Sequence, residues 1–194
     1  EWWHAYYPAS FVTLSTSHIE AFYWINMYKM ASATKPERFV YDLMGPWYID
    51  GTGWPDLHWD LNVQLTYWPL FTSNRIDFVR SLTALLDAQT PNLILNVPPD
   101  WRNDSAAAPS GASSLECMET CYWNYGERDP ARDTCLTTPP TVTGNLMWAM
   151  QLYHEVFRRT LNTTLLRTGV FPLLRRAVNF YTHLQIKVPD KAAP

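Results

Sequence analysis

The chain has 194 residues, of which 47% are hydrophobic and 17% are charged, with a formal net charge of −3. That length and composition are enough for one domain with a sizeable core. The slightly acidic balance excludes a basic nucleic-acid-binding surface, and no apolar run approaches the roughly 20 residues of a membrane span.

The first predicted element is a helix over residues 18–33. Ser17-His-Ile-Glu20 fits a capping box, in which the two side chains satisfy free backbone donors. Apolar residues follow at positions 19, 22, 23, 27 and 30, which is helical spacing. A loop of about twenty residues is expected next, marked by Pro36, Gly45, Pro46, Gly51, Gly53 and Pro55.

The segment 54–74 combines aromatic rings, an imidazole, carboxylates and amides, with no cation until Arg75. Such a mixture suits a sugar site, because rings stack on the apolar face of a pyranose while amides and carboxylates bind its hydroxyls. A buried helix with core aromatics is the alternative. Within this segment, polar and apolar residues alternate from 60 to 65, which fits an extended strand. They equally fit a helix from Pro55 with Leu57, Leu61, Leu65 and Trp68 inward.

Three more helices are expected along the chain. One covers 73–89, with Ser73 as its cap, and ends before Pro91. Residues 97–143 form an elaborated surface loop with room for one short helix at 115–122. Apolar spacing predicts a helix over 146–161, and Pro172 suits the first turn of a helix over 172–186. Without a convincing alternating strand, the predicted class is all-α.

Cysteines and sequons indicate an extracellular or luminal chain. Cys117, Cys121 and Cys135 lie near the glycosylation sequons that begin at Asn103 and Asn162. Three cysteines allow one disulfide plus a thiol, or a bridge to another part of the protein. No His lies near enough to complete a zinc site, so no metal is expected.

Asp60-Leu-Asn62-Val-Gln64-Leu-Thr-Tyr67-Trp68-Pro69 resembles the Asn-x-Asn-x-Gln-x-Asn-Tyr-Trp-Pro signature of glycoside hydrolase family 95, the inverting α-L-fucosidases and their relatives. The resemblance extends to Glu20–Ser32, to Gly45-Pro-Trp47 and to 144–184, and leaves only about 95–143 peculiar to this chain. It implies that residues 1–194 are part of an (α/α)6 toroid of the six-hairpin glycosidase type. The family's β-sandwich would precede this part, and the other half of the toroid would follow it.

The resemblance also implies the roles of site residues. The family uses two Asn side chains, at the positions of Asp60 and Asn62, to polarise the attacking water. Here Asp60 replaces the first Asn, and a carboxylate can accept a proton directly as a general base. The general acid would be a Glu in a Ser-Pro-Glu motif beyond Pro194, roughly 6.5–9.5 Å from the base. The predicted sugar contacts are His58, Trp59, Gln64, Tyr67, Trp68, Trp47 and Trp54.

The expected function is that of a secreted inverting glycosidase that removes terminal α-linked sugars of the α-L-fucoside or α-L-galactoside type from glycans. No cofactor is expected. The partners would be the glycan and the remaining polypeptide of the same enzyme. The alternative is a catalytically inactive helical toroid that serves as a glycan-binding or structural module in a larger assembly.

Overall fold

The computed structural model describes residues 1–41, 43–47, 57–59, 61–108, 111–112 and 144–187, and this part of the chain is predominantly helical, which confirms the all-α class. Its longer helices are α2 (Ser17–Ala33), α3 (Asn62–Thr72), α4 (Arg80–Ala88), α6 (Asn145–Thr160) and α8 (Phe171–Lys187). The shorter ones are α1 (Trp2–Tyr6), α5 (Thr90–Leu95), α7 (Thr163–Leu165) and the π-helical turn η5 (Leu166–Val170). The 3₁₀ turns among the described residues are η1 (Tyr7–Ala9), η2 (Ile76–Val79) and η3 (Pro99–Trp101).

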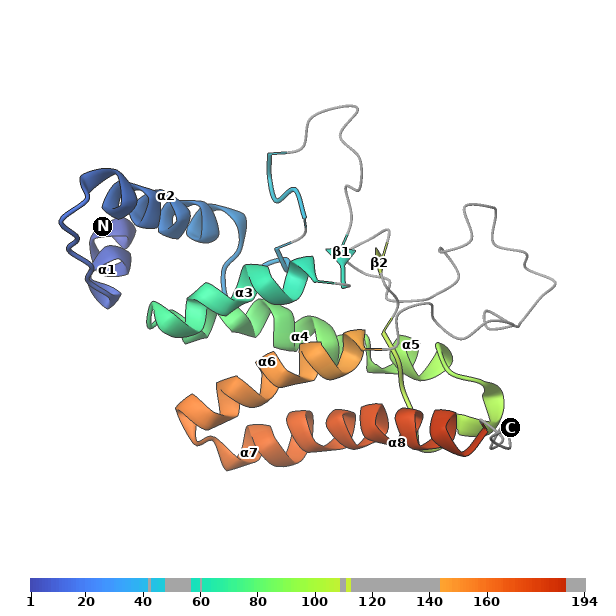
Figure 1. Cartoon of the computed structure of the whole chain (residues 1–194). Coiled ribbons are helices and arrows are strands. Elements are labelled where there is room, and N and C mark those ends of the chain that lie inside the picture. The colour runs from blue at the N-terminus through green and yellow to red at the C-terminus, as the bar shows by residue number, and fades with distance from the viewer. Residues whose placement is uncertain (42, 48–56, 60, 109–110, 113–143, 188–194) are drawn as a thin grey trace, which may run out of the picture.

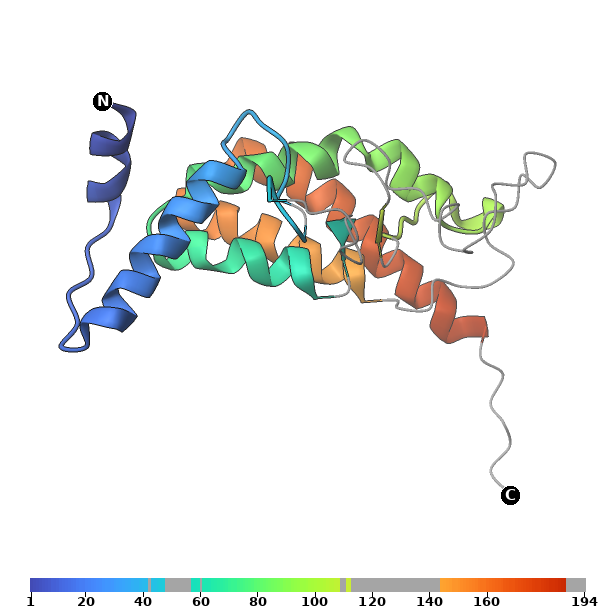
Figure 2. The same ribbon diagram turned by 90° about the horizontal axis from the view of Figure 1, so that it is seen from above.

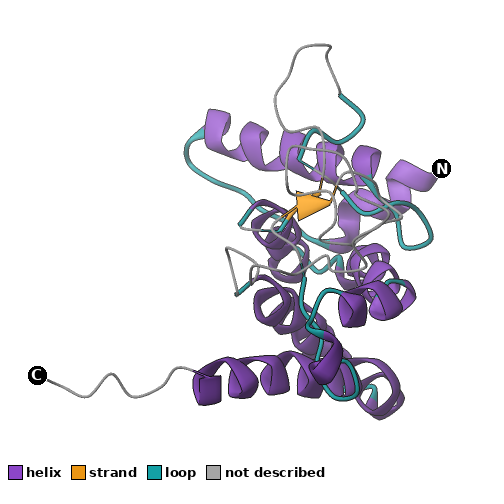
Figure 3. Cartoon of the chain, turned by 90° about the vertical axis from the view of Figure 1, so that its right-hand side faces the viewer, coloured by secondary structure: helices purple, strands orange, loops and turns teal. Residues whose placement is uncertain are grey.

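Helical hairpins make up the body of the molecule. The helices α6 and α8 run in opposite directions, as do α3 and α4, and α6 packs against both α3 and α8 (Figure 1). Seen from above, α1 and α2 lie at one end of this stack (Figure 2). The side view shows the helices layered on one another (Figure 3). The core between the layers holds fully buried side chains such as Leu82, Leu86, Met150, Leu152 and Tyr153.

The helix predicted at 18–33 forms as α2, but two details of that prediction are wrong. Ser17 is the first helical residue rather than the cap, and the Glu20 carboxylate accepts a hydrogen bond from Leu14 N at 2.8 Å. Only the second half of the apolar stripe is buried, while Ile19 and Phe22 are 50% and 67% exposed. These two residues line a hollow between α2 and α3, and the buried residues of α2 all lie in its C-terminal half.

The helix α3 begins at Asn62, and an extended segment precedes it. The extended interpretation of residues 60–65 therefore fails from Asn62 onward, and a helix starting near Pro55 is excluded by the strand at Leu57–His58. The predicted inward face is also wrong, because Leu65 and Trp68 are 52% and 40% exposed. The buried face carries Val63, Gln64, Tyr67, Leu70 and Phe71, which have helical spacing as well.

The helix predicted at 73–89 starts later, at Arg80. Ser73 ends α3, and Asn74 adopts a left-handed conformation with φ of 57° that breaks the helix. The predicted end before Pro91 is confirmed, since α4 stops at Ala88. The sequence prediction does not include α5, because proline usually ends a helix, although it is also compatible with a helix's first turn.

The last two helices are confirmed as α6 and α8. The apolar spacing of Leu146, Met150, Tyr153, Phe157 and Leu161 predicts one inner face, but Leu161 closes α6 with φ of 51° and is 73% exposed. The predicted apolar stripe of the last helix is Leu174, Ala177, Tyr181 and Leu184. In α8 the most buried residues are instead Leu173, Ala177 and Phe180, so the stripe shares Ala177 and is otherwise shifted by one residue.

The first part of the predicted surface loop is packed rather than exposed. Val97, Trp101 and Ala107 form a small second core with Phe180 of α8. The Arg176 guanidinium donates to the Arg102 carbonyl at 3.2 Å. Packing and hydrogen bonds thus hold residues 97–108 against α8. The possible helix at 115–122 and the cysteines Cys117, Cys121 and Cys135 lie outside the described residues.

A two-stranded antiparallel pair joins distant parts of the chain. The strand β1 (Leu57–His58) pairs with β2 (Gly111–Ala112), with Leu57 opposite Ala112 and His58 opposite Gly111. This pair was not predicted, because two residues are too few to show an alternating pattern. It places residues 111–112 beside the start of α3.

Gly169 is the position where we expect a small substitution to disturb this packing most. An added Cβ would lie 2.1 Å from the Tyr153 hydroxyl oxygen, and Tyr153 is fully buried and bonded to Asp87 at 2.7 Å. Gly169→Ala should therefore lower the free energy of unfolding by about 1–3 kcal/mol in urea denaturation. Gly144→Ala is the control, since its nearest neighbour would be 3.9 Å away. Equal midpoints for the two variants would contradict this expectation.

Candidate functional site

The signature motif lies where β1 passes into α3. His58 ends the strand, and Asn62 is the first residue of the helix; both are half-buried. The helix has no side-chain cap at Leu61. Asp60 lies between them in sequence but, like Trp54, lies outside the described residues. The structure therefore brings His58 and Asn62 to the same end of α3.

Gln64 holds the turn that leads into this helix. Its Nε2 donates to the backbone carbonyl of Trp59, and the side chain is 1% exposed. Because this bond spans the start of α3, it constrains the backbone that carries His58 and Asn62. The buried Gln64 side chain thus stabilises the backbone conformation at the start of α3.

Trp59 and Tyr67 are fully buried. The Tyr67 hydroxyl accepts a hydrogen bond from Tyr41 N at 2.7 Å and lies 2.8 Å from Ser81 Oγ. Neither ring has a face open to a ligand in this structure. Sugar contacts by Trp59, Gln64 and Tyr67 remain predictions, and the observed role of all three is in packing and hydrogen bonding.

Among the aromatic residues that were predicted to contact sugar and that the structure describes, Trp47 and Trp68 have accessible surface, each being 40% exposed. Segment 43–47 passes over the same end of α3 as β1 (Figure 1, cyan trace). Trp68, by contrast, follows Asn62 by six residues, which places it about 240° around the helix and about 9 Å along it. Trp47 is therefore better placed than Trp68 to share a site with Asn62.

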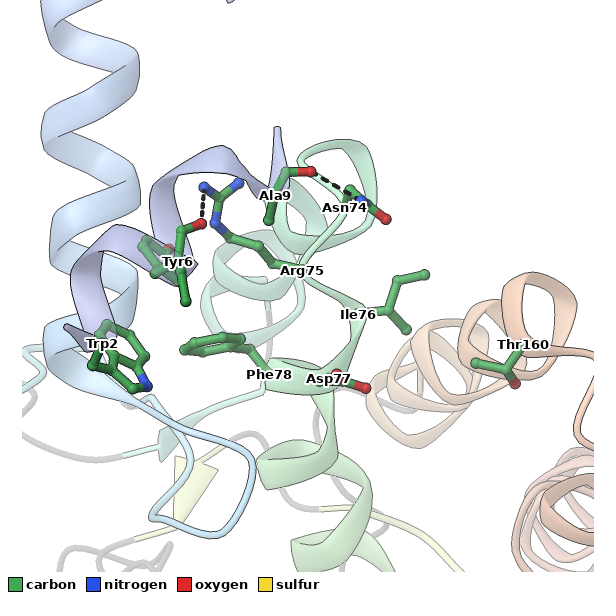
Figure 4. Close-up of a pocket in the computed structure, with 10 residues that line it drawn as sticks. Trp2, Tyr6, Ala9, Asn74, Arg75, Ile76, Asp77, Phe78 and Thr160 are labelled. Carbon is green, nitrogen blue, oxygen red and sulfur yellow. Dashed lines mark hydrogen bonds between the residues drawn. The ribbon is translucent and has the colours of Figure 1, made fainter. Parts of the chain in front are cut away.

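A hollow of about 420 Å³ lies at the opposite end of α3, beside Arg75 (Figure 4). Arg75 is 3% exposed and donates to the Ser73 carbonyl at 2.7 Å and to the Tyr6 carbonyl at 3.1 Å. Its guanidinium lies 4.3 Å from the centre of the Tyr6 ring. Burial raises the pKa of Tyr6 to about 12, against the lowering effect of Arg75.

Arg75 fastens the first ten residues to the turn after α3, because it also donates to the Ser10 hydroxyl. The sequence does not identify Arg75 as a structural residue, although its place as the first cation after a long stretch without Lys or Arg is a signal. This hollow is roughly 15 Å along α3 from Asn62 and contains none of the predicted site residues. A second hollow, of about 560 Å³, lies between α2 and α3 and is lined only by uncharged residues.

Neither a metal site nor a membrane-spanning helix occurs among the residues that the structure describes. That part of the chain has no group of three or more His, Cys, Asp or Glu side chains that could hold a metal ion. Within the same residues, no helix is long and apolar enough to cross a membrane.

Comparison with known proteins identifies the family. The family model described as "Glycosyl hydrolase family 95 catalytic domain" matches residues 14–193, which include the motif and helices α2 to α8. No curated protein and no solved structure matches the chain. The chain therefore belongs to glycosyl hydrolase family 95, and it carries sequence of that family's catalytic (α/α) toroid.

Proposed function

We propose that this chain supplies the water-activating side of an inverting glycosidase that removes terminal α-L-fucoside or α-L-galactoside units from glycans. One observation supports the proposal most. The chain changes from strand to helix between His58 and Asn62. Residues two apart inside a helix point in nearly opposite directions, and this restriction does not apply before Asn62, where α3 begins, so the proposal has Asp60 and Asn62 act on one water.

The proposed reaction is a single displacement. Asp60 accepts a proton from the water while the water oxygen attacks the anomeric carbon. The Asn62 amide orients that water. A carboxylic acid from the remaining polypeptide of the enzyme protonates the departing glycosidic oxygen, at the separation of roughly 6.5–9.5 Å that inversion requires. Attack from the face opposite the leaving group inverts the configuration.

Trp47 and His58 are the proposed sugar contacts with accessible surface. The Trp47 ring is suited to stacking on the apolar face of the sugar, and an imidazole nitrogen can bind a ring hydroxyl. Recognition of this kind needs no cofactor.

A secreted location is part of the proposal. The sequon residues Asn103 and Asn162 are both exposed. The Asn162 side-chain oxygen accepts a bond from Leu165 N at 3.0 Å, which a glycan attached to the side-chain nitrogen would leave in place. The exposure of both sequon asparagines is compatible with glycosylation in the secretory pathway.

The proposal is tested with aryl α-L-fucoside and aryl α-L-galactoside as substrates for the full-length enzyme. We expect hydrolysis of one of them, with the β-anomer appearing first in ¹H NMR spectra of the product. Initial release of the α-anomer would contradict inversion. Binding of L-fucose or L-galactose without turnover of either glycoside would instead support a glycan-binding module.

A further inference from the structure

We infer that Thr34, Ser81 and Tyr67 are positioning residues, which act together to hold Trp47 at the sugar site. The inference deepens the proposed function and depends on it for the identity of the ligand. Neither Thr34 nor Ser81 belongs to the signature motif. Their side chains are 2% and 3% exposed, so they act through other residues rather than by touching a sugar.

The three hydroxyl groups meet in the core. Ser81 Oγ lies 2.8 Å from the Tyr67 hydroxyl and 2.9 Å from Thr34 Oγ1, and it donates to the Phe78 carbonyl at 3.0 Å. Thr34 directly follows α2, Tyr67 lies within α3 and Ser81 lies in the first turn of α4. A single cluster of hydroxyls therefore joins three helical elements that are distant in sequence.

This cluster holds the loop after α2 at two points. Thr34 Oγ1 is placed to donate its one proton to the Phe39 carbonyl at 2.7 Å or to Ser81 Oγ at 2.9 Å, and Tyr41 N donates to the Tyr67 hydroxyl at 2.7 Å. Since Ser81 already donates to a carbonyl, Tyr67 can donate to Ser81 while accepting from Tyr41. The backbone at Tyr41 is thus fixed by a side chain of α3.

Close packing extends this constraint from Tyr41 to Trp47. Gly45 has φ of +58°, and an added Cβ there would lie 2.6 Å from the Tyr41 ring and 3.2 Å from the Trp47 ring. The two rings are 6.4 Å apart between centres, and Lys29 Nζ lies 5.9 Å from the centre of the Trp47 ring. The position of the exposed Trp47 ring therefore depends on the backbone that Tyr67 holds.

The first test is amide hydrogen exchange. Tyr67→Phe keeps the buried ring but removes the hydroxyl, so amides in residues 41–47 should exchange at least about tenfold faster. Tyr153→Phe is the matched control, because it removes a hydroxyl from another fully buried tyrosine that bonds to Asp87 instead. Equal exchange of residues 41–47 in the two variants would overturn the inference.

A second pair of variants separates the hydroxyl from the size of the side chain. Thr34→Val preserves the shape but not the hydroxyl, whereas Thr34→Ser preserves the hydroxyl. We expect faster exchange in residues 41–47 for the Val variant and near-parent exchange for the Ser variant. The same result for both would show that the Thr34 hydroxyl does not position the loop.

The last test connects the network to the ligand through a double-mutant cycle. Trp47→Ala and Tyr67→Phe should each weaken binding of L-fucose or L-galactose, and the double variant should bind no more weakly than Trp47→Ala alone. Additive losses would overturn positioning through Trp47. If the parent protein binds neither sugar, the proposed function fails. The inference is then decided by the exchange experiment and by the ¹⁹F shift of fluorotryptophan at position 47 in Tyr67→Phe.

Discussion

Replacing Asp60 by Asn is expected to lower the turnover of the α-glycoside substrate by about 10²–10⁴, with sugar affinity largely kept. The reason is chemical rather than steric. An amide has nearly the size and hydrogen-bonding capacity of a carboxylate, yet it cannot accept a proton from water near neutral pH. The measurement is kcat for the full-length enzyme, together with the Kd for the free sugar.

Two further variants make the Asp60 result specific. Asn62→Ala should also lower kcat, because the attacking water loses its second partner. Asp77→Asn is the control, since Asp77 is an exposed carboxylate beyond the opposite end of α3. Full activity of Asp60→Asn would mean that the Asn pair of the family signature works in this site as well, and that Asp60 is not the base.

Replacing Trp59 by Ala is expected to lower the free energy of unfolding by about 3–5 kcal/mol. The Trp59 side chain is fully buried, so truncation removes its apolar contacts and leaves a cavity. Urea denaturation monitored by circular dichroism measures the loss. Trp68→Ala is the matched control on α3, because Trp68 is 40% exposed and its loss should cost much less.

Stability and sugar binding together distinguish the two roles considered for Trp59. A core role predicts a large loss of stability in Trp59→Ala and a smaller one in Trp59→Phe, which refills part of the space. Parent-like stability combined with lost sugar affinity would contradict the core role. That outcome would mean that the Trp59 ring turns outward to meet the ligand.

Features of the fold that depend on short-range patterns were predictable. The helices α6 and α8 appear at nearly the expected residues, because their apolar spacing and Pro172 act within a few turns of the chain. The motif from Asp60 to Pro69 led to the family, because several uncommon residue types occur there at fixed spacing. Both inferences needed only neighbouring residues.

The orientation of α3 could not be predicted in this way. Leu61, Leu65 and Trp68 form one apolar stripe, while Val63, Tyr67 and Leu70 form another, and both have helical spacing. Packing against α6 selects the second stripe. That choice depends on residues more than seventy positions further along the chain, so a local pattern contains no information about it.

The sequence by itself determined which chemical groups are available near the motif: carboxylate, amides, imidazole and rings. Only the tertiary structure decided their places. It buries Trp59, Gln64 and Tyr67 and leaves Trp47 and Trp68 accessible. It also brings Thr34 within 2.9 Å of Ser81, across 47 residues of sequence. Hydroxyl groups so far apart carry no periodic signal, and they become partners only because α2, α3 and α4 pack together.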